Sequence, residues 1–117
     1  MGTTTDAYLV YGVRIESDSL NSDGGWRAEE GTPKWMLYNV HEHDGLRIQA
    51  HCSSEFPEFI VCSATPRYVA SRGYPESIDP RQLVVPEGTD DKILAYCKKH
   101  GLKTEGNVSW LLCSYWG

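Results

Sequence analysis

The histidines of residues 41–51 are the first candidates for chemistry in this chain. His41 and His43 are two residues apart, so a strand would place both rings on one face, and His51 and Cys52 follow closely. A tetrahedral zinc site needs four ligands that converge on one point. In the hairpin expected here, His51 points away from the face of His41, and Cys52 lies far along the ladder. We therefore predict no metal site and no cofactor.

The cysteines offer a second kind of chemistry. Cys62 or Cys97 could pair with His100 as nucleophile and base, but no nucleophile elbow or triad signature surrounds them. The four cysteines lie in apolar runs without a C-x-x-C spacing, which is typical of reduced, buried thiols. The sequence leans away from an enzyme, and a small zinc- or cysteine-dependent enzyme stays only as a third alternative.

Three arginines in a loop-rich stretch form the third candidate. Arg67, Arg72 and Arg81 lie near Tyr74 in a chain that is otherwise acidic. Guanidinium groups bind phosphate in a bidentate way and stack on planar rings. These residues predict a pocket for an anionic, nucleotide-like ligand, and the chain carries no glycine-rich phosphate loop that would add to it.

Length and charge limit the class of protein. A chain of 117 residues predicts a single domain, and a net charge of −5 argues against direct binding of nucleic acid. No apolar run is long enough to span a membrane, and residues 1–6 lack the features of a signal peptide and are expected to be flexible. We therefore expect a cytoplasmic protein.

An acidic, glycine-rich segment over residues 17–33 predicts a long loop. Trp26 stands in its middle, and an aromatic residue there either folds back onto the domain or anchors a partner. Acidic and aromatic side chains together would suit a basic protein surface. The predicted contact residues are Trp26, Glu29, Glu30, Trp35 and Tyr38.

Alternating and periodic apolar residues predict the elements. Strands are expected over residues 8–16, 59–63 and 108–117. A β-hairpin over residues 34–53 is expected to turn at Asp44 and Gly45, so that Leu37 pairs with Cys52 and Gln49 faces solvent. Residues 77–83 suggest a short helical turn, and residues 90–100 a helix with Ile93, Leu94 and Cys97 as its apolar stripe.

These elements predict an α+β fold. We expect a single domain with a mainly antiparallel sheet of about five strands and one principal helix packed on it. The two terminal strands are apolar on both faces, so they are expected to pair at the centre of the sheet.

The C-terminal third resembles the ends of small proteins encoded by bacteriophages. The resemblance lies in Leu94, Cys97, His100 and Gly101, followed by Trp110 to Leu112 and Ser114 to Gly117, and Tyr11 to Arg14 fit it. It implies an accessory protein of the anti-defence, anti-CRISPR-like kind, which inhibits a host protein by stoichiometric binding. The host partner would be a basic nuclease or a nucleic-acid-binding complex. The alternative is an oligomeric sponge that sequesters a nucleotide-like signal.

Overall fold

The fold is described from a computed structural model, which covers residues 5–16, 18, 28–37 and 42–116. Helices and strands follow one another along the chain as β1 (Thr5–Ile15), α1 (Pro33–Trp35), β2 (Glu42–His43), β3 (Leu46–Ser53), β4 (Pro57–Ser71), the 3-10 turn η4 (Pro80–Gln82), α2 (Thr89–Lys99) and β5 (Thr104–Trp116). The expected α+β class is confirmed, with a five-stranded, mainly antiparallel sheet and one main helix.

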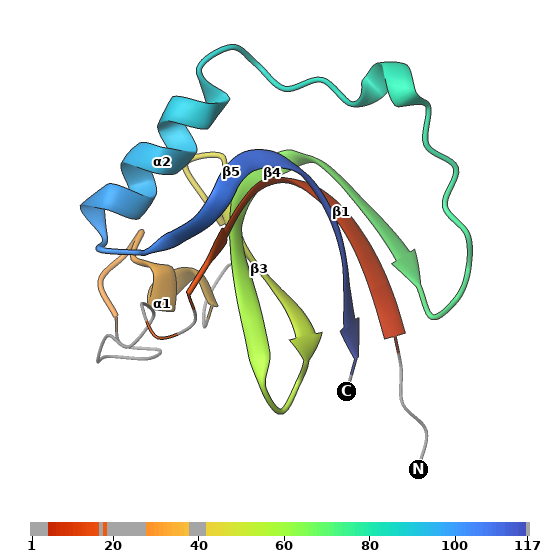
Figure 1. Cartoon of the computed structure of the whole chain (residues 1–117), viewed down its shortest axis with the longest axis horizontal. Helices are drawn as coiled ribbons and strands as arrows, with labels where there is room; N and C mark the ends of the chain where they lie inside the picture. The colour runs from red at the N-terminus through yellow and green to blue at the C-terminus, as the bar shows by residue number, and fades with distance from the viewer. Residues whose placement is uncertain (1–4, 17, 19–27, 38–41, 117) are drawn as a thin grey trace.

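The sheet bends over as an arch. Its strand order is β2-β3-β4-β1-β5, and β4 and β1 each continue from one leg of the arch into the other (Figure 1). The tips of the two legs meet where β3 pairs in parallel with β5, at Cys52 with Tyr115 and Ser53 with Trp116. This contact joins β5, at one end of the order, to β3, which is next to the other end, and so gives the sheet a concave side between the two legs.

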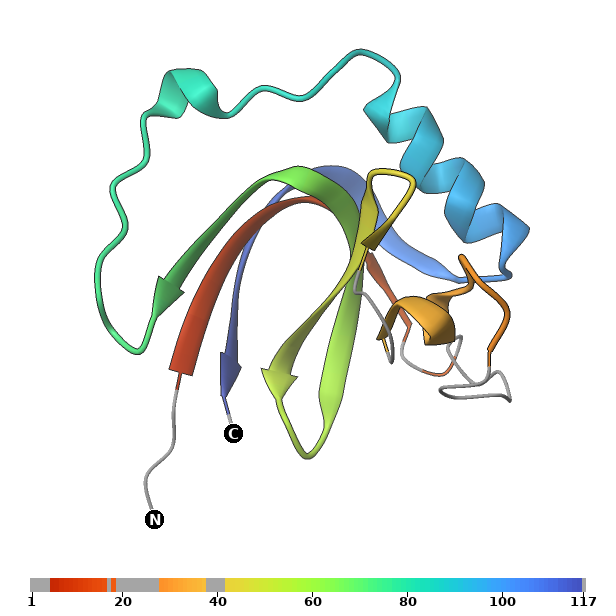
Figure 2. The same cartoon turned by 180° about the vertical axis from the view of Figure 1, so that it is seen from behind.

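Helix α2 lies on the convex side of the arch, together with residues 72–88, which we call the strap (Figures 1 and 2). Ile93 and Cys97 of α2 are buried against the sheet, and Leu102 folds back so that its N–H donates to the carbonyl of Cys97 at 2.8 Å. The expected stripe is wrong in one member, because the side chain of Leu94 is 43% exposed.

A smaller apolar cluster fills the concave side. Val10, Ile60 and Cys62 are buried there, and Tyr8, Leu111 and Cys113 pack around them. Gly12 lets β1 and β4 approach closely, because a Cβ at this position would lie 2.2 Å from the carbonyl oxygen of Val61. The sheet therefore carries apolar side chains on both of its faces.

The tip of the predicted hairpin is confirmed and its lower part is wrong. Glu42 pairs with Arg47 across a turn in which Asp44 and Gly45 both have positive φ. Residues 34–37 are helical instead, because Thr32 caps α1 and Pro33 occupies its first turn. The expected pairing of Leu37 with Cys52 therefore does not form, and residues 38–41 lie outside the described residues.

Two strands differ from expectation in extent or place. β4 runs through Pro66 as one strand of 15 residues, so it extends beyond the expected residues 59–63 at both ends. β5 pairs with β1 along most of its length, which confirms the pairing of the terminal strands. However, β5 lies at the end of the strand order and not at its centre, and Leu112 is 77% exposed.

Candidate functional site

A cavity of about 410 Å³ opens along the free edge of β3 on the concave side of the arch. Four consecutive residues of β3, Arg47 to Ala50, line it, which places it along the edge of this strand. Tyr8 of β1, Arg67 of β4 and Tyr115 of β5 face it from the other leg. The remaining lining residues are Lys34, Leu37, Pro57 and Phe59.

Arg67 is held in this cavity by two contacts. Its Nε donates to the side-chain oxygen of Gln49 at 3.0 Å, and its guanidinium carbon lies 4.9 Å from the ring centroid of Tyr8. Gln49 is only 5% exposed, and its own amide nitrogen donates to the carbonyl of Ala50 at 2.9 Å. Arg67 is therefore positioned by a buried amide and by a cation–π contact.

Arg47 brings a second guanidinium group to the same cavity. Its Nε is buried and has no hydrogen-bond partner within the part of the chain that the structure describes. A buried N–H group without a partner costs about 1–3 kcal/mol, so native proteins rarely leave one. Arg47 is therefore a side chain that lines the cavity and is held there at a cost in stability.

Carboxylates do not neutralise this pair of arginines among the described residues. The ion pairs found there join Arg81 to Asp79 and Lys92 to Asp44, away from the cavity. Glu42 stands opposite Arg47 in the ladder, but no salt bridge joins the two side chains. The cavity is therefore a cationic site in a chain whose net charge is −5.

The titration of the neighbouring groups agrees with this geometry. Burial lowers the pKa of Arg67, and the adjacent charge of Arg47 lowers it further. Burial likewise raises the pKa of the Tyr8 hydroxyl, an effect that Asp6 adds to and the two arginines oppose. Both arginines would gain from an anion in the cavity, because it would offset their mutual repulsion.

The opposite wall of the cavity is apolar. Leu37, Pro57, Phe59 and the ring of Tyr115 line it beside Ile48. A binding site with a cluster of polar groups and an apolar wall suits a ligand that has a charged head and a flat or apolar body.

A second cavity of about 360 Å³ shares no lining residue with the first. Cys52 lines the second and its pairing partner Tyr115 the first, so the contact between β3 and β5 stands between them. Arg14 and His51 line the second cavity, and burial lowers the pKa of His51 although Glu58 opposes this shift. Arg14 and Glu58 both lie near His51, so an acidic group accompanies the positive charge of Arg14 at this second cavity.

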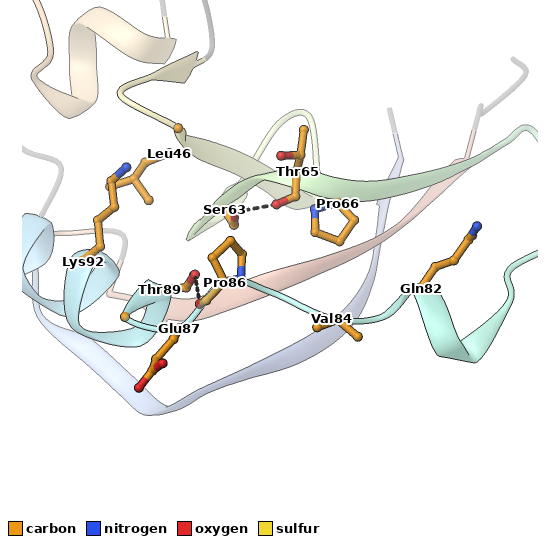
Figure 3. A pocket seen from close by; sticks show the side chains of 12 residues that line it. Leu46, Ser63, Thr65, Pro66, Gln82, Val84, Pro86, Glu87, Thr89 and Lys92 are labelled. Carbon is orange, nitrogen blue, oxygen red and sulfur yellow. Dashed lines mark hydrogen bonds between the residues drawn. The ribbon is translucent and has the colours of Figure 1, made fainter.

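A larger cavity of about 610 Å³ lies between the strap, the start of α2 and the sheet (Figure 3). Three of its polar side chains already have partners. Ser63 donates to the carbonyl of Thr65 at 2.7 Å and Thr89 donates to that of Pro86 at 2.6 Å (Figure 3). Lys92 lies 3.8 Å from Asp44. It is a poorer candidate than the arginine cavity, despite its size.

Of the predicted partner-binding residues, the structure describes Glu29, Glu30 and Trp35. Glu29 and Glu30 are exposed, whereas Trp35 is half-buried, packs against the larger core and meets His43 edge to face at 5.6 Å between ring centroids. Trp26 and Tyr38 lie outside the described residues, as does His41.

The predicted ligand-binding residues are separated by the fold. Arg67 lines the arginine cavity, whereas Arg72, Tyr74 and Arg81 are exposed and are not among its lining residues. Arg81 is held by Asp79 at 2.8 Å, an ion pair of the kind expected between these neighbours. Of the predicted ligand-binding residues, only Arg67 lines the arginine cavity, and the second arginine there is Arg47.

Sequence reasoning missed Arg47, Gln49 and Tyr8 as site residues. Gln49 was expected to face solvent, and it is buried because the concave face of the arch is enclosed. A usable signal was present, since Arg47 and Gln49 alternate with Ile48 and Ala50 along β3 and so share the face of a strand.

Metal and thiol chemistry find little support in the described residues. They contain no group of three His, Cys, Asp or Glu side chains that could hold a metal ion. Cys62 and Cys97 are buried, and burial raises their pKa values to about 12 and about 11. Thiols with such pKa values are weak nucleophiles at neutral pH.

None of the described helices is both long and apolar enough to cross a membrane. Comparison with protein-family models, with curated proteins and with solved structures finds no match for this chain.

Proposed function

We propose that this protein binds a small anionic, nucleotide-like ligand in the arginine cavity and acts by sequestering it. The observation that carries the proposal is the pair of guanidinium groups, Arg47 and Arg67, that share one half-buried cavity without a carboxylate partner among the described residues. Desolvated cations without partners are unfavourable unless a ligand supplies the counter-charge.

The protein provides three different contacts for such a ligand. Arg67 and Arg47 offer hydrogen-bond donors and charge, and the apolar wall around Phe59 covers a ring or another flat body. The resemblance to phage anti-defence proteins suggests a host signalling nucleotide as the ligand. Sequestration requires tight binding and no turnover, which agrees with a site built from arginines and aromatic rings.

The test is the change in melting temperature on adding millimolar adenosine monophosphate, guanosine monophosphate, phenyl phosphate or benzoate. A ligand that binds the native state raises the melting temperature by mass action. We expect at least one of these anions to raise it for the wild type, and the rise to disappear in Arg67→Gln and Arg47→Gln.

Arg81→Gln is the matched control, because Arg81 is exposed and paired with Asp79 outside the cavity. It should keep the full ligand-induced rise, and circular dichroism would verify that all three variants are folded. The proposal is wrong if no anion of the set raises the melting temperature, or if both cavity variants respond like the wild type.

We propose inhibition of a host protein as a second candidate, on the basis of a different surface. Phe56, Leu112 and Trp116 are large apolar side chains that are exposed, and the N–H of Ser54 donates to the carbonyl of Trp116, which brings the turn of Phe56 next to the end of β5. Exposed aromatic and aliphatic anchors of this kind favour binding to a protein partner.

The partner would be a basic nuclease or a nucleic-acid-binding complex, given the acidic charge of the chain. A pull-down from bacterial lysate should recover it with the wild type, and Leu112→Glu should lose it. Val84→Glu places the same charge at an exposed apolar position on the strap and should retain the partner. Equal recovery by the two variants would refute this surface.

A further inference from the structure

The hydrogen bonding of Arg67 determines which of its donors remain for a ligand. Its Nε is taken by Gln49 at 3.0 Å, and the amide nitrogen of Gln49 is tied to Ala50 at 2.9 Å. Gln49 is therefore fixed at both ends and holds the guanidinium plane in one orientation. The two terminal nitrogens of Arg67 remain at the end of the side chain as a pair of parallel donors.

Tyr8 restricts the approach of a ligand still further. Its ring lies 4.9 Å from the guanidinium carbon of Arg67 and so covers one face of that group. A ligand must then reach Arg67 end-on, through an oxyanion with two oxygens at the spacing of the paired donors. Arg47 also lines the cavity, from β3, and adds the donors at the end of its own guanidinium group.

The number of charges decides between classes of anion. A monoanion such as a carboxylate or a phosphate diester would neutralise one of the two arginines and leave the other desolvated. A phosphate monoester carries close to two negative charges at neutral pH and has three oxygens to share between two guanidinium groups. It therefore matches both the charge and the donors of the cavity.

We propose that the ligand of the arginine cavity is a phosphate monoester, bound end-on by Arg67 and from the side by Arg47, with its organic body against the apolar wall. This inference rests on the proposed anion binding and specifies the chemical class of the ligand. Gln49 is a positioning residue in it, because it acts on the ligand through Arg67.

The experiment compares phenyl phosphate, a monoester, with methyl phenyl phosphate, a diester that has the same ring and a single charge. Isothermal titration calorimetry near pH 7.5 should give a dissociation constant at least about tenfold smaller for the monoester. On acidification to about pH 5 the dianion of the monoester takes up one proton and becomes a monoanion, because the pKa of its second ionisation is about 6. The affinity of the protein for the monoester should then fall by up to about tenfold.

The diester controls for every titration on the protein side. The titratable groups that line the cavity are Tyr8 of β1, Lys34 of α1, Arg47 of β3, Arg67 of β4 and Tyr115 of β5. Asp6, Cys62 and Cys113 lie outside the lining and act on Tyr8 or Arg67 through their charges. A change in the charge of any of them alters the binding of the diester as well as that of the monoester. Only the titration of the ligand itself would weaken the monoester alone.

Gln49→Glu supplies a second readout that a merely structural role would not move. The new carboxylate beside Arg67 would neutralise one of the two cations, so the preference for the dianion should shrink from about tenfold towards about equal affinity. Gln49→Met, which removes the amide without adding charge, should weaken the monoester but keep part of the preference.

The outcomes separate this inference from the proposed function. Equal affinity for the two esters, with no loss for the monoester on acidification, would overturn the monoester assignment while anion binding itself stands. Binding of neither ester at millimolar concentration would refute the anion site as a whole. A tenfold preference for the monoester that survives unchanged in Gln49→Glu would also overturn the monoester assignment, because the preference would then not depend on the two positive charges of the cavity.

Discussion

Replacement of Arg47 by methionine should stabilise the unliganded protein while it weakens anion binding. The Nε of Arg47 is buried without a partner, and a buried unsatisfied donor costs about 1–3 kcal/mol. Methionine keeps an unbranched apolar side chain of similar reach, so the packing of the stem is largely retained. The change also removes the charge that lowers the pKa of Arg67.

The expected result is a gain of about 1–2 kcal/mol in the free energy of unfolding, which is the cost of the unsatisfied donor less a small loss in packing. Residues that are held in an unfavourable state for binding typically show this opposition between stability and function. Urea unfolding in a buffer free of phosphate would measure it, as a higher midpoint with an unchanged slope. Phosphate must be absent because it is itself a candidate ligand.

Arg81→Met is the control, since Arg81 is exposed and its removal should change the free energy of unfolding by less than about 0.5 kcal/mol. In the presence of phenyl phosphate, the difference in the free energy of unfolding between Arg47→Met and the wild type should narrow or change sign, because the ligand stabilises the wild type more. A loss of stability in Arg47→Met, together with undiminished binding of phenyl phosphate, would refute the reasoning about this cavity.

Three further predictions test the fold. Ile93→Ala should lower the free energy of unfolding by about 2–5 kcal/mol, because Ile93 of α2 is fully buried. Leu94→Ala should lower it by about 1 kcal/mol or less, because Leu94 is exposed. Equal losses in urea unfolding would contradict the observed packing of α2. Gly12→Ala should cost about 1–3 kcal/mol or more, because its Cβ would meet the carbonyl of Val61 at 2.2 Å, and a melting temperature equal to that of the wild type would contradict the close approach of β1 and β4. The pKa of His51 is lowered in the folded protein, so its contribution to stability is present above the ordinary histidine pKa of about 6.5 and is lost as the pH falls. His51→Gln should therefore make the free energy of unfolding less dependent on pH between about 7 and 5. An unchanged dependence on pH would contradict this reasoning.

Local patterns were sufficient for most of the elements. The turn at Asp44 and Gly45, the register of Glu42 with Arg47 and the stop of α2 at Gly101 follow from residues close together in the chain. The start of α2 was less predictable, since Gly88 precedes it in a left-handed conformation and no side chain caps it.

Alternation along β3 was read correctly but assigned to the wrong environment. It places Arg47 and Gln49 on one face and Ile48 on the other, and the expectation was that the polar face would be solvated. Whether such a face is solvated depends on the curvature of the sheet and on the meeting of its two ends, and neither is encoded in one strand.

The arginine site shows most clearly where the sequence stops being informative. The composition of residues 67–81 indicated an anion site, and the fold keeps only Arg67 of the predicted residues in it. Arg67 finds its hydrogen-bond partner Gln49 at a separation of 18 positions along the chain, and no local spacing in the sequence relates the two residues.

The sequence by itself determined the α+β class, the antiparallel pairing of the terminal strands, the hairpin tip and the main helix, because each depends on periodicity, turn residues or the apolar character of a segment. Only the tertiary structure decided that the sheet bends into an arch, that β5 lies at its edge, and that two arginines and a glutamine line one cavity. The physical reason is that side-chain parity within a strand is local, whereas the burial of either face depends on contacts between segments far apart in the chain, such as that of Cys52 with Tyr115.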